Sequence, residues 1–154
     1  LRKWVKRADW YMLSEYTVAW IAADSPHGWD MGLEWIESDD EMICTAGWST
    51  LGNVVSVLPD EKLDFGKINE LLDRVEKNLH DSPNRVRYVM NGFVICVGSY
   101  VADLTTRALE VGKNVGKVNV EMGGTACKVP DAVPYINKIM GMERIGKKRK
   151  KARC

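Results

Sequence analysis

Helix-capping residues, prolines and apolar periodicity divide most of this sequence into segments of helical length. Ser25-Pro26 and Ser82-Pro83 each place a favourable N-cap residue before a proline, and an acidic capping box begins at Ser38. Apolar residues then recur at the i, i+3, i+4 and i+7 positions that place them on one face of a helix. The expected helices span residues 26–36, 39–55, 63–80, 84–100, 103–115 and 131–140.

Evidence for strands is confined to one short run. Lys117–Glu121 alternates weakly with period two and is followed by glycines. The sequence therefore predicts an all-α fold, in which residues 116–130 form a structured loop that closes over a helix.

Two of the expected long helices resemble each other at an offset of 45 residues. Ala46-Gly47-Trp48 aligns with Asn91-Gly92-Phe93, so a glycine precedes an aromatic residue in both. A helix pair that repeats every ~40–47 residues is typical of HEAT-like arrays, which predicts a helical-repeat solenoid, an α-α superhelix of stacked antiparallel helix pairs. A non-repetitive helical bundle is the alternative. Because glycine inside a helix costs about 1 kcal/mol relative to alanine, Gly47, Gly92 and Gly98 are expected where helices pack closely.

Length and composition suit one globular domain. The chain has 154 residues, of which 45% are hydrophobic, so residues 1–154 are expected to form a single domain with its own core. No signal peptide and no apolar run near the ~20 residues of a membrane span are found, which predicts a cytoplasmic protein with no membrane partner. Because the sequence begins with Leu1 and opens directly into charged residues, we expect it to be the C-terminal portion of a longer protein.

Charge is segregated along the chain, although the net charge is only +1. Residues 8–61 contain eleven acidic residues and no Lys or Arg, whereas residues 83–154 contain fourteen Lys or Arg and five Asp or Glu. The first part repels phosphate and the second attracts it. Residues 144–154 form a basic tail, for which a phosphate contact and a solvated, disordered end are both open interpretations.

Motifs for metals and cofactors are missing from the sequence. The four cysteines form no CxxC pair, which excludes a zinc ribbon or a redox motif and favours free thiols in a reducing compartment: Cys44, Cys96, Cys127 and Cys154. His27 and His80 have no Cys, Asp or Glu at metal-ligand spacing. We expect a monomer with no metal and no cofactor.

The stretch Asp9–Asp24 combines several aromatic residues with a carboxylate. If it is helical, Tyr11 and Glu15 are four residues apart and lie one above the other on one face. An aromatic ring beside a carboxylate can form a binding or catalytic site, but Tyr11 could also be a rim residue and Glu15 a solvated one. Trp10 and Trp20 are interpreted as core residues.

A family resemblance is carried by ADWYMLSEYTVAWIAADSP at residues 8–26, SPNRVRYVMNGFVICVGSYV at 82–101, GGTACKVPDA at 123–132 and IGKKRKKARC at 145–154. Together these runs resemble the DNA alkylation repair family, the HEAT-like-repeat alkylpurine DNA glycosylases. The resemblance implies a DNA repair enzyme that needs no cofactor and hydrolyses the N-glycosidic bond of N3- or N7-alkylated purines. Its implied partner is double-stranded DNA with alkylated bases.

Within this resemblance, Glu15 and Tyr11 fall on the family's aspartate and tryptophan and become the candidate catalytic residues. A carboxylate beside the sugar stabilises an oxocarbenium-like state and orients the attacking water, and an aromatic face attracts a cationic base. The family's DNA-gripping arginine should fall beside Thr45, where this chain has no basic residue. The alternative is therefore a non-catalytic HEAT-like module that binds nucleic acid or protein.

DNA contacts are expected from one helix and from the tail. Arg85 and Arg87 lie in the first turn of an expected helix, where free backbone N–H groups also favour phosphate. Phe93 falls on the aromatic member of the family's Gly-Trp pair, and Asn91 either faces the DNA or makes a buried hydrogen bond between helices. The predicted DNA-binding residues are Trp48, Arg85, Arg87, Asn91, Phe93, Lys147, Lys148 and Arg149.

Overall fold

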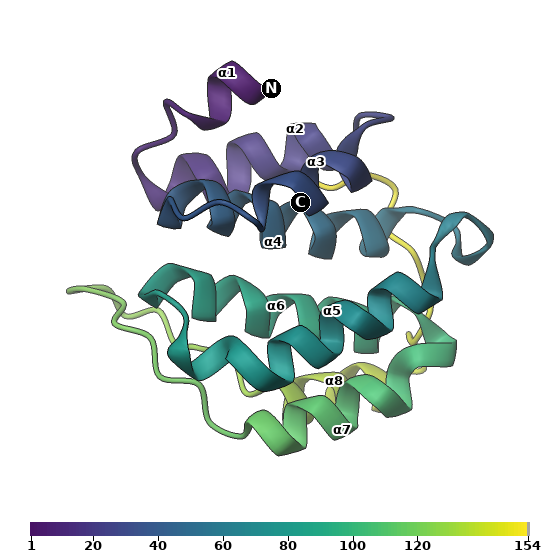
Figure 1. Ribbon diagram of the computed structural model, residues 1–154. Helices are drawn as coiled ribbons and strands as arrows, with labels where there is room; N and C mark the ends of the chain where they lie inside the picture. Colours follow the sequence, from purple (N-terminus) through teal and green to yellow (C-terminus); the bar gives the residue numbers. More distant parts are fainter. Residues whose placement is uncertain (154) are drawn as a thin grey trace.

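The computed structural model describes residues 1–153 as a stack of helices (Figure 1). No β-strand occurs in this part of the chain, so the all-α prediction is confirmed. The helices and helical turns, in chain order, are α1 (Arg2–Val5), η1 (Leu13–Val18), α2 (Ala19–Ala23), α3 (Gly28–Trp35), α4 (Glu41–Val57), η2 (Asp60–Lys62), α5 (Phe65–Asn78), η3 (Leu79–Asp81), α6 (Asn84–Tyr100), η4 (Ala102–Leu104), α7 (Thr105–Val115) and α8 (Ala132–Gly141). Each expected helix is present, with ends close to those predicted. The predicted caps Ser25 and Ser82 are wrong, because their hydroxyls donate to the preceding carbonyls of Ala22 and Asn78 and neither caps the helix that follows.

The helices pack in two layers. The continuous segment η1–α2 contacts α4, α4 packs along α6, and α6 contacts α8. We call this row the inner layer. The outer layer consists of α3, α5 and α7, of which α5 and α7 lie in front of the inner helices in Figure 1. Each outer helix is followed in sequence by the inner helix it contacts, which produces stacked helix pairs.

The first turn of α4 shows why this long helix begins where it does. The Asp40 carboxylate accepts hydrogen bonds from the backbone N–H groups of Met42 at 2.9 Å and Ile43 at 3.1 Å. These bonds satisfy two of the donors that a helix start leaves unpaired. Ser38 Oγ instead accepts from the N–H of Asp40. The predicted capping box at Ser38 is therefore corrected: the cap is Asp40, two residues later.

The aromatic residues matched by the 45-residue offset meet in the core between α4 and α6. Trp48 and Phe93 are each 1% exposed. Their ring centroids lie 5.4 Å apart, with an edge-to-face angle of 66° between the planes, an arrangement that aromatic pairs favour. The repeat detected in the sequence thus corresponds to two stacked helices of the inner layer.

The glycines inside the helices have two different roles. A Cβ at Gly47 would lie 2.6 Å from the backbone nitrogen of Ile36, and one at Gly98 would lie 2.5 Å from Cδ1 of Ile136. Both mark close helix packing, as predicted. A Cβ at Gly92 would meet no atom within 4 Å, so the same prediction is wrong for Gly92, which faces open space.

The stretch Asp9–Asp24 forms most of the first inner-layer element. Residues 11–23 are helical, with the wider π-helical turn η1 at their centre. Val18 is fully buried, whereas Trp10 is 55% exposed and Trp20 is half-buried. The predicted core position is wrong for Trp10, because this residue precedes the first helical turn and rests edge-on against the neighbouring Tyr11.

The basic tail folds back onto the first helices as far as it is described. Ala152 is buried, and its N–H donates to the Asp24 carboxylate at 2.8 Å. Lys148 Nζ donates to the carbonyl of Val55, and the N–H of Arg149 donates to that of Ser56. These donors satisfy carbonyls at the end of α4 that have no partner within the helix. The interpretation as a disordered end is therefore wrong.

The connection between α7 and α8 is a loop that covers the start of α6. Asn84 at the start of α6 donates to the Glu121 carbonyl at 2.9 Å and accepts from the Glu121 N–H at 2.7 Å. The prediction of a structured loop over a helix is confirmed.

Within residues 1–153 no single helix is long and apolar enough to cross a membrane. Helix α6 reaches that length and hydrophobicity only together with residues 102–115, and the two segments are bent sharply relative to each other.

Candidate functional site

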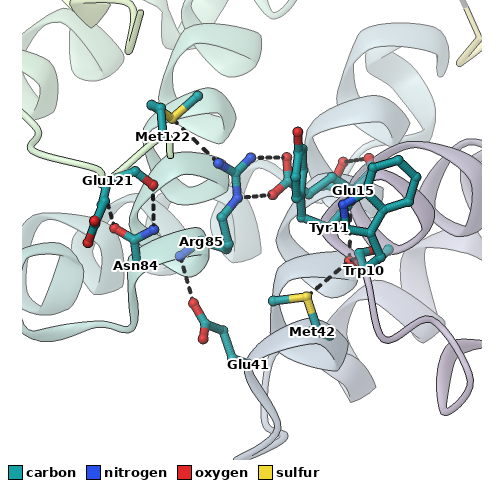
Figure 2. A network of polar contacts seen from close by, with 11 residues as sticks. Trp10, Tyr11, Glu15, Glu41, Met42, Asn84, Arg85, Glu121 and Met122 are labelled. Carbon is teal, nitrogen blue, oxygen red and sulfur yellow. Dashed lines mark hydrogen bonds and ion pairs between the residues drawn. The ribbon is translucent and has the colours of Figure 1, made fainter. Parts of the chain in front are cut away.

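Glu15 and Arg85 form a buried ion pair between η1 and α6. The Arg85 guanidinium donates to both carboxylate oxygens of Glu15, from Nε to Oε1 at 2.5 Å and from Nη2 to Oε2 at 2.6 Å (Figure 2). The Glu15 side chain is 2% exposed and that of Arg85 11%. A bidentate pair of this kind is strong and fixes the relative orientation of both groups.

Two tyrosine rings also contact the guanidinium. Arg85 Cζ lies 4.4 Å from the ring centroid of Tyr11 and 4.6 Å from that of Tyr88. Both distances are within the range of a cation–π attraction. Tyr11 and Glu15 therefore lie together, as their four-residue spacing predicted, and the group they share is Arg85.

Two side chains of α4 contact the backbones of the ion-pair residues and hold both in place. The hydroxyl of Ser49 donates to the main-chain carbonyl of Glu15 at 2.5 Å. This bond provides a partner for a carbonyl in the π-helical turn, where helical hydrogen bonding is altered. Glu41 accepts from the backbone N–H of Arg85 at 2.7 Å, so a carboxylate at the start of α4 stabilises the N-terminus of α6.

The electrostatic environment of the pair is set by burial. Burial raises the pKa of the Glu15 carboxyl, and the hydrogen bonds and positive charge of Arg85 oppose this shift. Burial works against the charged form of Arg85, but the hydrogen bonds to Glu15 raise its pKa overall. Burial also raises the pKa of the neighbouring Tyr16 hydroxyl to about 12. Arg85 therefore stabilises the charged form of Glu15 in a poorly solvated place, and Glu15 compensates the buried charge of Arg85.

A cavity of about 350 Å³ runs along the inner layer beside this pair. It is bounded by η1, α4, α6, the end of the α7–α8 loop and α8. The lining residues are Glu15, Tyr16, Trp48, Ser49, Gly52, Asn53, Tyr88, Val89, Gly92, Phe93, Cys96, Pro130 and Tyr135. An acidic residue, three tyrosines and two helical glycines thus line one space.

The helix residues predicted to contact DNA are mostly inside the molecule. Trp48 and Phe93 are buried against each other at the side of the cavity. Asn91 is 3% exposed and donates from Nδ2 to the Pro130 carbonyl at 2.8 Å. The structure corrects the DNA-facing positions of these three residues, because their side chains are occupied in the core or by the loop. The alternative for Asn91, a buried hydrogen bond between helices, is right about burial and wrong about the partner, which is a loop carbonyl.

The two arginines of α6 have different surroundings. Arg85 is enclosed by Glu15 and the tyrosines, and its Nη1 lies 3.4 Å from the sulfur of Met122 in the α7–α8 loop (Figure 2). Arg87 is half-buried, donates to Asn84 at 3.3 Å, and lines a second cavity of about 650 Å³ under the same loop. A free phosphate contact therefore requires Arg85 to leave its ion pair, whereas for Arg87 it stays a prediction.

The tail residues predicted to contact DNA also differ in whether their side chains are already bound. Lys148 pairs with Asp60 at 2.7 Å, and Arg149 donates to Asn53 at 3.4 Å and to the Ala152 carbonyl. Lys147 is exposed. Because Asn53 lines the cavity, Arg149 places the tail at the edge of the inner-layer cavity.

The sequence interpretation missed Tyr88, Ser49 and Glu41, which complete the surroundings of the ion pair. Tyr88 follows Arg85 by three residues and so lies on the same face of α6, a spacing that could have identified it. Ser49 and Glu41 act through contacts with residues far away in sequence, which no local pattern signals. Arg85 was recognised only as a phosphate ligand.

Two further features of the described residues concern metal ligands and cysteine thiols. Within residues 1–153 no group of three His, Cys, Asp or Glu side chains could hold a metal ion. Cys44, Cys96 and Cys127 are free thiols, and Cys154 lies outside the described residues.

Comparison with known proteins relates this arrangement to a known fold. One solved structure superimposes with a TM-score of 0.90 and 33% sequence identity, over 99% of this chain and 65% of that chain. That structure is described as representing a new family of proteins that is related to the HEAT-like repeat DNA glycosylases and has affinity for branched DNA structures. The chain has the HEAT-like repeat fold. The predicted solenoid of stacked helix pairs is thereby confirmed, and the fold is related to that of the HEAT-like repeat DNA glycosylases.

Curated relatives extend the similarity without adding a function. The uncharacterised protein Lmo0209 of Listeria monocytogenes is 38% identical over 140 residues, and the uncharacterised protein Lin0241 of Listeria innocua is 36% identical over 140 residues. The aligned part is 90% of this chain and 59% of each relative, so the chain spans less than two thirds of their length. No protein-family model matches the chain.

Proposed function

We propose that this chain is the DNA-binding part of a HEAT-like repeat protein that recognises branched DNA and does not excise bases. Similarity over 99% of the chain to a solved protein described as having affinity for branched DNA supports the ligand class. The inner layer supplies the surface, because its cavity is lined by aromatic side chains and bordered by the basic tail.

The charge distribution of the tail supports the same ligand. Lys148 and Arg149 attach the tail to α4, and the residues around them remain in solvent: Lys147, Lys150, Lys151 and Arg153 are exposed. Exposed cations of this kind are suited to the phosphates of DNA, whose neutralisation provides most of the affinity of such proteins.

One observation supports binding rather than catalysis: both carboxylate oxygens of Glu15 are hydrogen-bonded to Arg85. A carboxylate that stabilises positive charge on a sugar must face that sugar with its own charge uncompensated. Here the guanidinium balances the charge and occupies the hydrogen-bonding positions. Glu15 and Arg85 therefore serve as a structural pair that fixes η1 against α6.

The second candidate function is the alkylpurine DNA glycosylase suggested by the family resemblance. It is favoured by the position of Glu15, which lines the inner-layer cavity beside Tyr16 and Tyr88. In that case DNA would have to draw Arg85 onto a phosphate and expose the carboxylate. Tyr11 and Glu15 would then act as the resemblance implies.

Two measurements on the same protein separate these functions. We expect tighter binding to a four-way DNA junction than to a linear duplex of the same length and composition, measured by fluorescence anisotropy at fixed salt. We also expect no release of 3-methyladenine or 7-methylguanine from methylated duplex DNA above the spontaneous rate. Release that is faster than spontaneous and absent in Glu15→Gln would overturn the non-catalytic proposal, and equal affinity for junction and duplex would overturn the branched-DNA proposal.

A further inference from the structure

We propose that the inner-layer cavity receives a single unpaired nucleobase from the branch point of the bound DNA. This proposal rests on the proposed function, which supplies the DNA, and adds a binding site for one chemical group. The cavity lies along the layer bordered by the basic tail, so a strand that follows the tail passes its opening. At about 350 Å³ it belongs to the lower end of the range for small-molecule pockets.

The walls of the cavity are suited to a flat aromatic group. Tyr16 comes from η1, Tyr88 from α6 and Tyr135 from α8, so three elements contribute a ring. Proteins hold unstacked bases on such rings, because a base that leaves its helix loses stacking that an aromatic side chain can replace. Ser49 and Asn53 of α4 add polar groups at the same wall.

The charge inside the cavity argues for a base rather than a phosphate. Its lining residues include the carboxylate of Glu15 and, within the described part of the chain, no Lys or Arg. A phosphate would find no cation among the lining residues, because Arg85 is already bound to Glu15 and does not line the cavity. One cation, Arg149, lies at the edge of the cavity instead, where it donates to Asn53. A neutral base inside and its phosphates outside match this distribution.

Gly92 keeps the cavity open. It lies in the middle of α6, where glycine costs about 1 kcal/mol relative to alanine, and a Cβ there would meet no atom within 4 Å. Close helix packing therefore does not explain this glycine. The missing side chain instead leaves the α6 backbone accessible between Tyr88 and Cys96, at the place where a flat ligand would rest.

The test uses two three-way DNA junctions that differ in one group. One carries a single unpaired adenine nucleotide at the branch point, and the other carries an abasic nucleotide at the same position. The wild-type protein is expected to bind the adenine junction about tenfold more tightly, since loss of base–aromatic stacking costs that order of affinity. Affinity is measured by fluorescence anisotropy at one salt concentration.

Gly92→Leu fills the cavity without a clash at Cβ and is expected to bind both junctions with the wild-type affinity for the abasic one. Gly141→Leu is the matched control, because Gly141 is also helical and has no atom within 4 Å of a Cβ, but does not line the cavity. It should keep the tenfold difference. If Gly92→Leu lowers the melting temperature, Tyr135→Ala replaces it, since Tyr135 is 45% exposed and outside the core.

The outcomes distinguish this site from the function on which it rests. Equal affinity of the wild-type protein for the two junctions, or a tenfold difference that persists in both Gly92→Leu and Tyr135→Ala, overturns the base-binding site and leaves DNA binding intact. Failure to bind either junction more tightly than a linear duplex contradicts the proposed function itself.

Discussion

Arg85 and Glu15 compensate each other's burial, and removing one leaves the other charge alone in a poorly solvated place. Breaking a buried pair in this way costs about 3–5 kcal/mol. We expect Arg85→Met to lower the free energy of unfolding by that order at pH 7, measured by urea denaturation. Arg87→Met is the control, because Arg87 lies on the same helix and its hydrogen bond to Asn84 is long, at 3.3 Å. An equal loss in both variants would contradict the assignment of the cost to the pair.

The same variant leads to a pH dependence with a definite sign. Burial raises the pKa of Glu15 already in the wild-type protein, and without Arg85 the main opposing charge is absent, so the pKa rises further. A carboxyl with a higher pKa in the folded state stabilises the fold when protonated, and this contribution is lost as the pH rises through the folded pKa. The deficit of Arg85→Met relative to wild type should therefore shrink as the pH falls through the raised folded pKa towards the unfolded value of about 4.3, and stay constant below it. A deficit that is constant between pH 4 and pH 7 would contradict this account.

The thiols allow a second residue-level prediction. Burial raises the pKa of Cys44 to about 11, so its reactive thiolate is scarce at neutral pH, whereas Cys127 is exposed in the α7–α8 loop. At pH 8, iodoacetamide should modify Cys127 in the folded protein and leave Cys44 protected, as measured by mass spectrometry of the digested protein. Unfolding in urea should remove the difference. Equal rates for the two peptides in the folded state would show that Cys44 is accessible and more acidic than the structure indicates.

At the scale of helices and their contacts, two glycines predict opposite effects of the same substitution. Gly47→Ala places a Cβ 2.6 Å from the backbone nitrogen of Ile36, so α3 and α4 must separate and the protein loses stability. Gly92→Ala meets nothing within 4 Å and removes the cost of glycine in a helix, so it should stabilise by about 0.5–1 kcal/mol. Thermal unfolding followed by circular dichroism measures both. A loss of stability in Gly92→Ala would mean that the cavity is closed in solution.

The helices themselves could be predicted because each carries its own signals. α5 has apolar residues at helical spacing and Asp64 at its start, and α7 ends at Gly116, whose φ of 66° suits glycine. The π-helical turn η1 could not be predicted in this way, because no local pattern signals the contact made there between the Ser49 hydroxyl of α4 and the Glu15 carbonyl. The exact cap of α4 was missed because Ser38 and Asp40 are both good cap residues.

The candidate site was harder to predict than the fold, because its contacts join residues that are far apart in the sequence. The spacing of Tyr11 and Glu15 predicted their shared face, since it is set within one helix. The group that they face is 70 residues away in sequence, and its position depends on how α6 packs. Trp48 and Phe93 matched a family pattern, but only the packing of α4 on α6 shows that their rings are turned towards each other.

At the scale of the whole molecule, the charge segregation seen in the sequence becomes a set of contacts between the two halves. Glu15 pairs with Arg85, and Asp60 pairs with Lys148 of the tail. Asp24 accepts from the backbone of Ala152. The acidic half therefore does not present all of its charge to solvent, and part of it holds the basic half in place. This leaves the remaining tail cations near the inner layer, where a negatively charged partner can reach them.

The tail should account for part of the salt dependence of DNA binding. Each phosphate contact contributes about one to the slope of log affinity against log salt, and Lys147, Lys150 and Lys151 of the tail are exposed. Replacing all three with Gln should reduce the magnitude of the slope for junction DNA by about two to three. Replacing Lys62, Lys77 and Lys113 removes the same charge from the outer layer and its turns, and should change the slope much less. Because both variants have the same net charge, an equal reduction in the two would mean that overall charge, rather than the position of the tail, determines how this protein holds DNA.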